Sequence, residues 1–157
     1  MATYFATIAW ERGDAAFVDQ RYSRAHSITF DGGAVVRGSS SPHSVPLPWS
    51  DPAGVDPEEA FVAALSSCHM LWFLSIAAAR GYRVDRYEDA AQGTMARDAE
   101  GRMAMTRVVL RPRADFGGDR RPSAADIEAM HHKAHVECYI ANSVRSEVRV
   151  EGTWRAA

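Results

Sequence analysis

The segment from Ala63 to Leu74 is the most apolar stretch of this chain, and it carries Cys68, one of only two cysteines. Its apolar side chains recur at steps of three and four residues, which is the spacing of one helix face. Apolar residues also occupy the other faces, so little of this helix is suited to contact with water, and we expect it at the centre of its domain. The face predicted to be most apolar consists of Phe61, Ala64, Leu65, Cys68, Leu71, Trp72 and Ser75.

Both ends of this helix are marked in the sequence. Asp56 is a favourable N-cap residue, Pro57 fits the first helical position, and Glu58 places a carboxylate where the helix dipole favours it. Gly81 is a typical residue to follow the last turn. The sequence therefore predicts a helix from Pro57 to about Arg80.

Strands are predicted on both sides of this helix. Three segments before it have the alternation or aromatic content of strands, and a strand pair, a second helix and a last strand follow it. Ser123 and Asp126 have the spacing of a helix N-cap pair, so the second helix is expected to begin there. The predicted strands are 3–11, 21–30, 34–38, 82–95, 103–116 and 144–154, with a long loop at 39–55 and a short third helix at 140–143.

This order of elements predicts the fold class. Strands that follow one another are expected to pair, and the helices stand in separate blocks, which is typical of α+β proteins rather than of parallel α/β sheets. About six strands of a 157-residue chain are too few to cover an apolar helix on several faces. We therefore expect a homodimer that packs around this helix.

The composition is that of a globular protein. With 157 residues, 46% hydrophobic and 24% charged, the chain is expected to form a single domain over residues 1–157. A net charge of −2 gives no reason to expect nucleic acid or an anionic membrane surface as a partner. The N-terminus lacks the pattern of a signal peptide, and polar residues keep the apolar run short of the ~20 residues of a membrane span. We expect a soluble, cytoplasmic protein.

The two cysteines leave three interpretations open. In a reducing compartment, Cys68 and Cys138 are not expected to form a structural disulfide, so they are inert core residues, metal ligands or a redox pair. His131, His135 and Cys138 stand at i, i+4 and i+7, which would place three zinc-ligand types on one face of a continuous helix, with Cys68 or Glu137 as a fourth ligand. The histidines are otherwise expected on the helix surface.

A non-enzymatic protein is a further alternative. The proline-rich loop at 39–55 and the apolar helix could frame a pocket for a small hydrophobic ligand, with Cys68 merely lining it. The second cysteine counts against this alternative, because a pocket needs only an apolar residue at each place. Consumption of thiols by peroxide would distinguish the two.

Two blocks of the sequence resemble the OsmC/Ohr family of organic hydroperoxide reductases. The first runs from Val55 to Cys68 and has an Asp-Pro-Glu helix start with a cysteine ten residues after the glutamate. The second, 134–143, is similar to the family's second-cysteine motif, which also precedes a last strand. The blocks occur in the expected order, seventy residues apart. His69 and Met70 depart from the apolar residues that often follow the reactive cysteine in this family.

The resemblance implies both a fold and a reaction. The fold is an intertwined homodimer in which two antiparallel sheets wrap two long central helices, with the active sites at the subunit interface. The resemblance further implies that Cys68 attacks a peroxide and becomes a sulfenic acid, and that Cys138 condenses with it to form a redox-active disulfide.

The resemblance also implies how Cys68 is activated. By position, Glu58 matches the glutamate that holds an arginine beside the reactive cysteine. Arg24 fits this arginine best, and Arg21 and Arg12 remain candidates. A guanidinium stays charged and can serve a carboxylate and a peroxide oxygen together.

The expected partners follow from the same chemistry. They are an organic hydroperoxide as substrate and a dithiol of the lipoyl type, or a small thiol, as reductant, in an antioxidant stress response. No metal, flavin or haem is required, because sulfur carries the reaction. Apolar residues near the reactive cysteine favour alkyl or aryl peroxides over hydrogen peroxide, namely Phe61, Leu65, Trp72 and, from the loop, Trp49.

Overall fold

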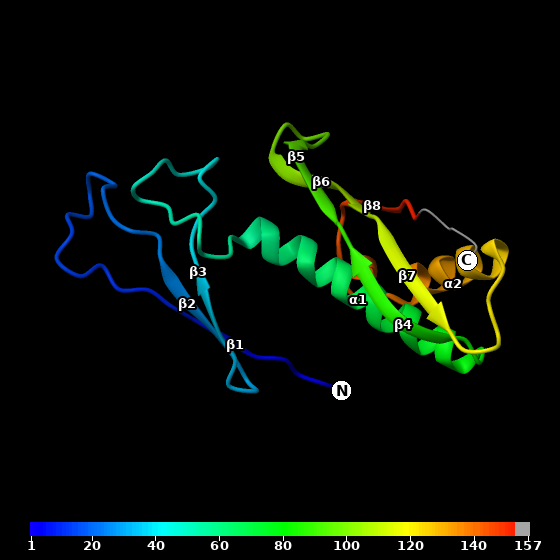
Figure 1. Ribbon diagram of the computed structural model, residues 1–157. Coiled ribbons are helices and arrows are strands. Elements are labelled where there is room, and N and C mark those ends of the chain that lie inside the picture. Colours follow the sequence, from blue (N-terminus) through cyan, green and yellow to red (C-terminus); the bar gives the residue numbers. More distant parts are fainter. Residues whose placement is uncertain (153–157) are drawn as a thin grey trace. The chain divides into compact units, whose positions relative to one another are not determined.

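The structure is a computed structural model that describes residues 1–152. Its elements follow one another as three strands, a long helix, four strands, a second helix, a 3-10 turn and a last strand (Figure 1). The described residues group into two compact units, the first Met1–Ala60 and the second beginning at Phe61. The single domain expected over residues 1–157 stays a prediction. Residues 153–157 lie outside the described residues.

The first unit contains an antiparallel sheet of three strands. β1 (Ala6–Ala9), β2 (His26–Phe30) and β3 (Val35–Gly38) pair in that order. A tight turn joins β2 to β3, in which the Gly33 N–H donates to the Phe30 oxygen and Gly33 has a φ of 87°, which glycine adopts at little cost. β1 and β2 are shorter than predicted, because the chain between them turns at Gly13 and Gln20, both with positive φ.

α1 (Pro57–Ala79) has the bounds that its sequence predicts. Asp56 caps it reciprocally: Asp56 Oδ1 accepts from the Glu59 N–H at 2.7 Å, and the Asp56 N–H donates to Glu59 Oε2 at 3.1 Å. Gly81, with a φ of 77°, follows the last turn. These local signals therefore fix both ends of the helix.

The buried face of α1 differs from the predicted face. Leu65, Phe73, Ile76 and Ala77 are buried together with His69, whereas Leu71 of the predicted face is 61% exposed. Because the helix is apolar on all sides, its own sequence does not determine which face is buried. The buried face is determined by the elements that pack against the helix.

The length of α1 also corrects an expectation. At 23 residues it is long and apolar enough to cross a membrane by length and composition, a test that the core helices of soluble proteins also pass. In this structure α1 contributes residues to both hydrophobic clusters of the second unit.

Each long strand predicted after α1 is broken into two. β4 (Arg83–Asp89) pairs with β7 (Pro112–Gly117), and β5 (Gln92–Arg97) pairs with β6 (Met103–Leu110), all antiparallel. The break lies where Pro112, which has no N–H, begins β7, and where Asp89 Oδ1 accepts from the Arg111 N–H at 2.6 Å. The described residues thus hold eight strands rather than six.

The C-terminal elements follow the prediction in part. α2 (Ala124–Glu137) begins with the predicted capping box of Ser123 and Asp126, and a 3-10 turn spans Ala141–Ser143. β8 (Glu147–Val150) pairs with β6 in parallel, a long-range pairing that local sequence does not indicate. The rest of the predicted strand, at 153–154, lies outside the described residues.

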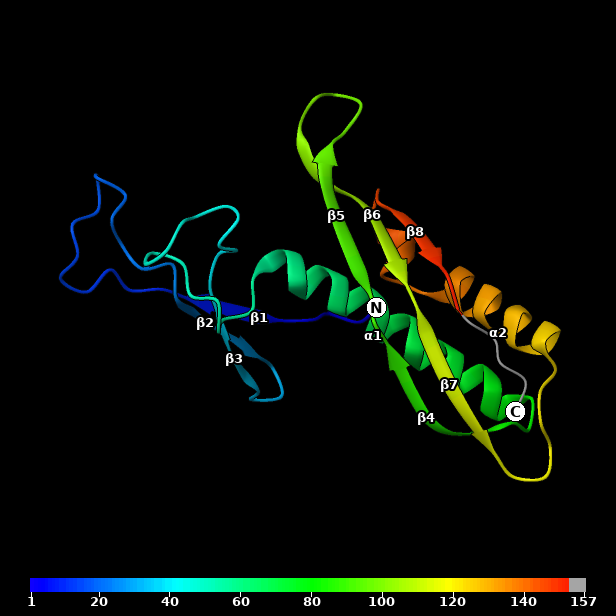
Figure 2. The same ribbon diagram turned by 45° about the horizontal axis from the view of Figure 1, so that its top comes forward.

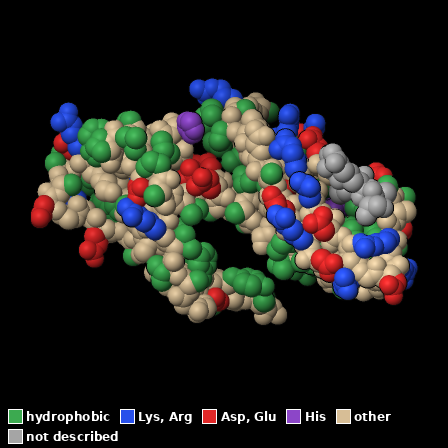
Figure 3. Space-filling view, in the orientation of Figure 1, with side chains coloured by type: hydrophobic (Ala, Val, Ile, Leu, Met, Phe, Trp, Pro, Cys, Tyr) green, Lys and Arg blue, Asp and Glu red, His purple; other side chains and the backbone are tan. Residues whose placement is uncertain are grey.

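Two hydrophobic clusters hold the second unit together. The first joins α1, α2, β4 and β7, and the second joins α1 to β6, β8 and the 3-10 turn. Figure 2 shows α2 lying beside α1 under these strands. Basic and acidic side chains are interspersed over the outer surface of this unit (Figure 3), where Arg107 pairs with Glu147 and Arg111 with Glu151. The buried residues are Phe73, Ile76, Ala77, Tyr82, Ile127, Met130 and Ala134 in the first cluster and Leu65, Val108 and Leu110 in the second.

Candidate active site

Cys68 and Cys138 come together although seventy residues separate them. Cys68 is half-buried in the middle of α1, and Cys138, 1% exposed, caps the C-terminal end of α2. Their side chains are close enough to interact, because Cys68 contributes to the shifted pKa of Cys138, and both thiols are reduced. The structure therefore brings the two cysteines of the sequence into one place, and their roles in a two-cysteine cycle stay a prediction.

The two thiols differ in their electrostatic surroundings. Burial raises the pKa of Cys138 to about 11, and its hydrogen bond with Cys68 contributes to the same shift. The Ala141 N–H donates to Cys138 Sγ at 3.4 Å, which opposes the shift. Cys138 is therefore a neutral thiol at physiological pH and can donate a proton toward the sulfur of Cys68.

Glu58 lies in the first turn of α1, as predicted, and it is half-buried. The capping box of this helix is closed by Glu59 and not by Glu58. Among residues 1–152, the side chain of Glu58 has no hydrogen-bond or ion-pair partner, so its carboxylate is available to a cation. Its assignment as the residue that holds the arginine stays a prediction.

Arg24 lies in the loop before β2, in the first unit. Its Nη1 donates to the backbone oxygens of Gln20 at 2.7 Å and Tyr22 at 2.5 Å, and its Cζ stands 3.8 Å from the centroid of the Tyr22 ring. Of the other two candidates, the Arg12 guanidinium donates to the backbone oxygen of Ala15. The choice of Arg24 stays a prediction.

A buried pair of histidines connects α1 to α2, and sequence analysis did not predict it. His69 Nε2 and His131 Nδ1 are 2.9 Å apart, and the His131 ring stacks on Phe73 at 4.0 Å between centroids. Burial lowers the pKa of His69 to about 4 and that of His131 to about 3, so both rings are neutral at pH 7. The expectation that these histidines lie on the helix surface is wrong for His131, which is 2% exposed.

The sequence did contain a signal for this pair. His69 stands within the apolar run of α1, and His131 follows Met130, a core residue of α2. A histidine on each of two apolar helix faces needs a partner when buried, and the two can satisfy each other.

The predicted metal-ligand face is not formed. α2 ends at Glu137, and Cys138 leaves the helix with extended backbone (φ −67°, ψ 108°), so it does not continue the face of His131 and His135. Within residues 1–152, no group of three or more His, Cys, Asp or Glu side chains is arranged to hold a metal ion.

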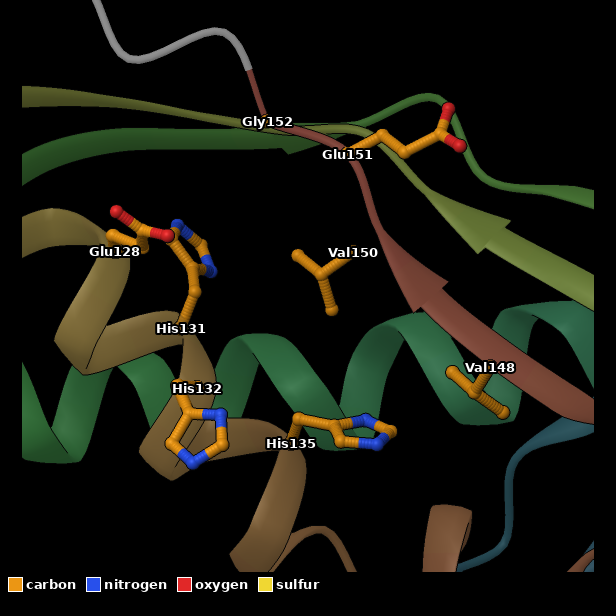
Figure 4. A pocket seen from close by; sticks show the side chains of 8 residues that line it. All are labelled: Glu128, His131, His132, His135, Val148, Val150, Glu151 and Gly152. Carbon is orange, nitrogen blue, oxygen red and sulfur yellow. The ribbon is translucent and has the colours of Figure 1, made fainter.

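A cavity of about 340 Å³ opens between α2 and the end of β8 (Figure 4). Its α2 wall carries His131, His132 and His135, and Val148 and Val150 line it from β8. Neither cysteine lines this cavity. Its imidazole and carboxylate walls also differ from the apolar pocket that the ligand-binding alternative requires.

The comparison with known families decides the identity of the chain. The family model described as OsmC-like protein matches residues 50–152, which include both cysteines. The chain belongs to the OsmC family. The α+β architecture, with two helices and antiparallel strand pairs, is that of OsmC-like proteins.

Solved OsmC-like structures resemble this one over nearly its whole length. An OsmC-like protein of unknown function from Vibrio cholerae is 52% identical, with 98% of this chain and 100% of that chain covered and a TM-score of 0.96. The organic hydroperoxide resistance protein OhrB of Bacillus subtilis is 19% identical, with 97% and 98% covered and a TM-score of 0.68. An organic hydroperoxide resistance protein from Legionella pneumophila is 16% identical, with 97% and 96% covered and a TM-score of 0.63. No curated protein matches the chain.

Proposed function

We propose that this OsmC-like protein is a thiol-dependent peroxidase that reduces organic hydroperoxides to alcohols in the cytoplasm. The contact between Cys68 and Cys138 carries the proposal, because it supplies both a sulfur that can attack and a thiol that can resolve the product. Two of the structural relatives are organic hydroperoxide resistance proteins by name, which supports the same substrate class.

The proposed cycle has two chemical steps. The Cys68 thiolate attacks one peroxide oxygen, the O–O bond breaks, and the departing alkoxide takes a proton to become an alcohol, leaving a sulfenic acid. The Cys138 thiol then displaces the hydroxyl group of this sulfenic acid, which leaves as water when the disulfide forms. An external dithiol, of the lipoyl type or a small thiol, returns both cysteines to the reduced state.

The proposed attack needs Cys68 as a thiolate, and a nearby cation favours that form. We assign this role to an arginine of the first unit, Arg24 in preference to Arg21 or Arg12, held by the carboxylate of Glu58. The uncommitted carboxylate of Glu58 supports this assignment, and the guanidinium fork suits both a carboxylate and a peroxide oxygen.

The proposed active form is a homodimer. Leu71 is 61% exposed on α1, and the exposed residues that share its helix face are small and uncharged, namely Ala64, Ser67, Ser75 and Ala78. An uncharged helix face of this kind suits close packing against a second copy of the same chain. Sedimentation analysis of wild type and Leu71→Asp tests this part of the proposal: a dimer that the variant dissociates is expected, and a monomeric wild type contradicts it.

The first test of the reaction is intact mass and free-thiol count after one equivalent of cumene hydroperoxide. Wild type should lose two hydrogen atoms and both thiols. Cys138→Ser should retain one added oxygen, and Cys68→Ser should not react. A wild-type protein that keeps both thiols contradicts the proposal, and equal rates with hydrogen peroxide contradict the preference for alkyl or aryl peroxides.

A further inference from the structure

Cys138 belongs to a compact turn and not to the body of α2. The cysteine turn, residues 138–143, is closed by its own hydrogen bonds: the Asn142 N–H donates to the Cys138 oxygen at 3.0 Å, and Ser143 Oγ donates to the Tyr139 oxygen at 2.7 Å. Asn142 Nδ2 further donates to the Val136 oxygen of α2 at 3.0 Å. The turn is thus internally ordered, and its position relative to Cys68 depends on what attaches it to α1.

Three residues of α1, about one helical turn apart, contact the cysteine turn. Ala141 packs against the cluster that contains Leu65, the Cys138 thiol meets Cys68, and the Tyr139 ring meets Trp72. Leu65, Cys68 and Trp72 stand at i, i+3 and i+7, so they lie on one helix face. The sulfur contact is therefore flanked on both sides by contacts between apolar groups.

The aromatic contact is the one nearest to Cys138 along the turn. The Trp72 and Tyr139 rings lie edge to face, with 5.5 Å between centroids and 87° between planes, a favourable aromatic geometry. Trp72 is itself packed against the buried cluster of α1 and α2, so it is a firm support. Tyr139 is 67% exposed, and Trp72 is its aromatic partner.

We infer that Trp72 and Tyr139 are positioning residues that hold Cys138 ready to resolve the oxidised form of Cys68. This inference rests on the proposed peroxidase function. When Cys68 is a sulfenic acid, the Cys138 thiol can attack its sulfur, forming the disulfide and releasing water. In competition, a second hydroperoxide can transfer an oxygen to the same sulfur, which gives a sulfinic acid and a second molecule of alcohol.

The aromatic contact determines the balance between these two fates. With the Tyr139 side chain held on Trp72, Cys138 stays within reach of Cys68, and disulfide formation outruns the second oxidation. Without it, Cys138 spends less time in position, and the sulfenic acid is exposed to peroxide for longer. The loss of an aromatic pair of this kind corresponds to a slowing of about three- to tenfold. Loss of the Tyr139 ring leaves the first step unchanged, because neither Cys138 nor Tyr139 takes part in the attack on the peroxide.

The experiment follows Cys68 by rapid quench and intact-mass measurement in wild type, Tyr139→Ala, Tyr139→Phe and Trp72→Leu. The probe is cumene hydroperoxide, at one equivalent and at a hundredfold excess. In Tyr139→Ala the species with one added oxygen should form at the wild-type rate. In Tyr139→Ala and Trp72→Leu this species should convert to the disulfide about three to ten times more slowly than in wild type. At high peroxide, the species with two added oxygens should accumulate in these variants.

Two controls separate positioning from general loosening. Tyr139→Phe keeps the ring and should behave as wild type. Val136→Ala removes an exposed apolar side chain near the same end of α2 and should also resolve at the wild-type rate. Circular dichroism establishes that each variant is folded.

The possible outcomes distinguish a failure of the positioning inference from a failure of the proposed peroxidase function. If wild type forms the disulfide and Tyr139→Ala resolves equally fast, or if Val136→Ala or Tyr139→Phe slows resolution as much, the positioning inference is wrong while the peroxidase function stands. If wild-type Cys68 takes up no oxygen, the proposed function fails and the inference fails with it.

Discussion

His69 Nε2 lies 2.9 Å from His131 Nδ1, although 62 residues separate these two histidines in the sequence. The bond joins the two helices that present the cysteines, one residue beyond Cys68 on α1 and seven residues before Cys138 on α2. Both rings are fully or almost fully buried, with Phe73 stacked on the second. A polar contact inside an apolar core is therefore one of the contacts that join α1 to α2.

This pair predicts a loss of stability in acid. The pKa is lowered to about 4 for His69 and about 3 for His131, whereas both are near 6.5 in the unfolded chain. Between these values the unfolded state binds more protons, so the contribution is fully present above pH 6.5 and is lost as the pH falls toward 4. At pH 5 the loss is on the order of 2 kcal/mol for each histidine.

Urea unfolding at pH 7.5 and pH 5 measures this effect. Replacing both residues, in His69→Leu/His131→Leu, should remove most of the pH dependence, whereas His132→Gln on the exposed side of α2 should keep it. A wild-type protein equally stable at both pH values is incompatible with two buried neutral imidazoles.

The Cys138 thiol should lose its proton at a much higher pH than an ordinary thiol does. Its pKa is raised to about 11, mainly by burial, so in the Cys68→Ser variant its alkylation by iodoacetamide should accelerate about tenfold per pH unit from pH 8 to pH 10 without levelling off. In urea the same thiol should level off near pH 8.5, its ordinary value. A plateau near pH 8.5 in the folded variant as well is the result that contradicts the assignment.

Substitutions of the two adjacent glutamates at the start of α1 should have different effects, one on stability and the other on activity. Glu59→Ala breaks the capping box with Asp56 and should lower the free energy of unfolding by about 1 kcal/mol. Glu58→Gln leaves this cap intact and should change stability little. Under the proposed mechanism it should slow peroxide reduction by about 10²-fold, because the proposed contact between Glu58 and the activating arginine is weakened. Stopped-flow oxidation and urea unfolding of both variants are the measurements. Equal effects of the two on activity would remove Glu58 from the site.

Gly93 of β5 lies close to Val62 of α1. A methyl group at this position would lie 2.7 Å from Val62 Cγ2 and 2.6 Å from Met105 Sδ, so Gly93→Ala should cost about 1–3 kcal/mol through overpacking. Gly32→Ala is the matched control, because a methyl group there meets nothing within 4 Å. Thermal unfolding of the two variants compares them directly, and equal melting temperatures would show that the helix and strand can separate without cost.

Local signals in the sequence were sufficient to predict the helix ends. Asp56, Gly81 and the Ser123–Asp126 pair act through hydrogen bonds or backbone preferences of residues a few positions apart, and each is found where it was expected. The closeness of the two cysteines could be predicted only through a resemblance to a family, since spacing along the chain says nothing about contacts across seventy residues.

Features that depend on distant partners could not be predicted in this way. The buried face of α1 is selected by the strands that cover it, because the helix is apolar on every side. The parallel pairing of β8 with β6 joins segments about forty residues apart, such as Arg107 and Glu147. The break between β6 and β7 was visible only as Pro112, a residue compatible with a strand edge as well as with a strand start.

The end of α2 at Glu137 separates two properties of this protein. The helix body, with Met130 and Ala134 in the core, provides the packing that keeps the chain folded. Cys138 stands just beyond it, on a turn with its own hydrogen bonds. The proposed disulfide would therefore join α1 to a separately hydrogen-bonded turn and not to the helix body that packs in the core.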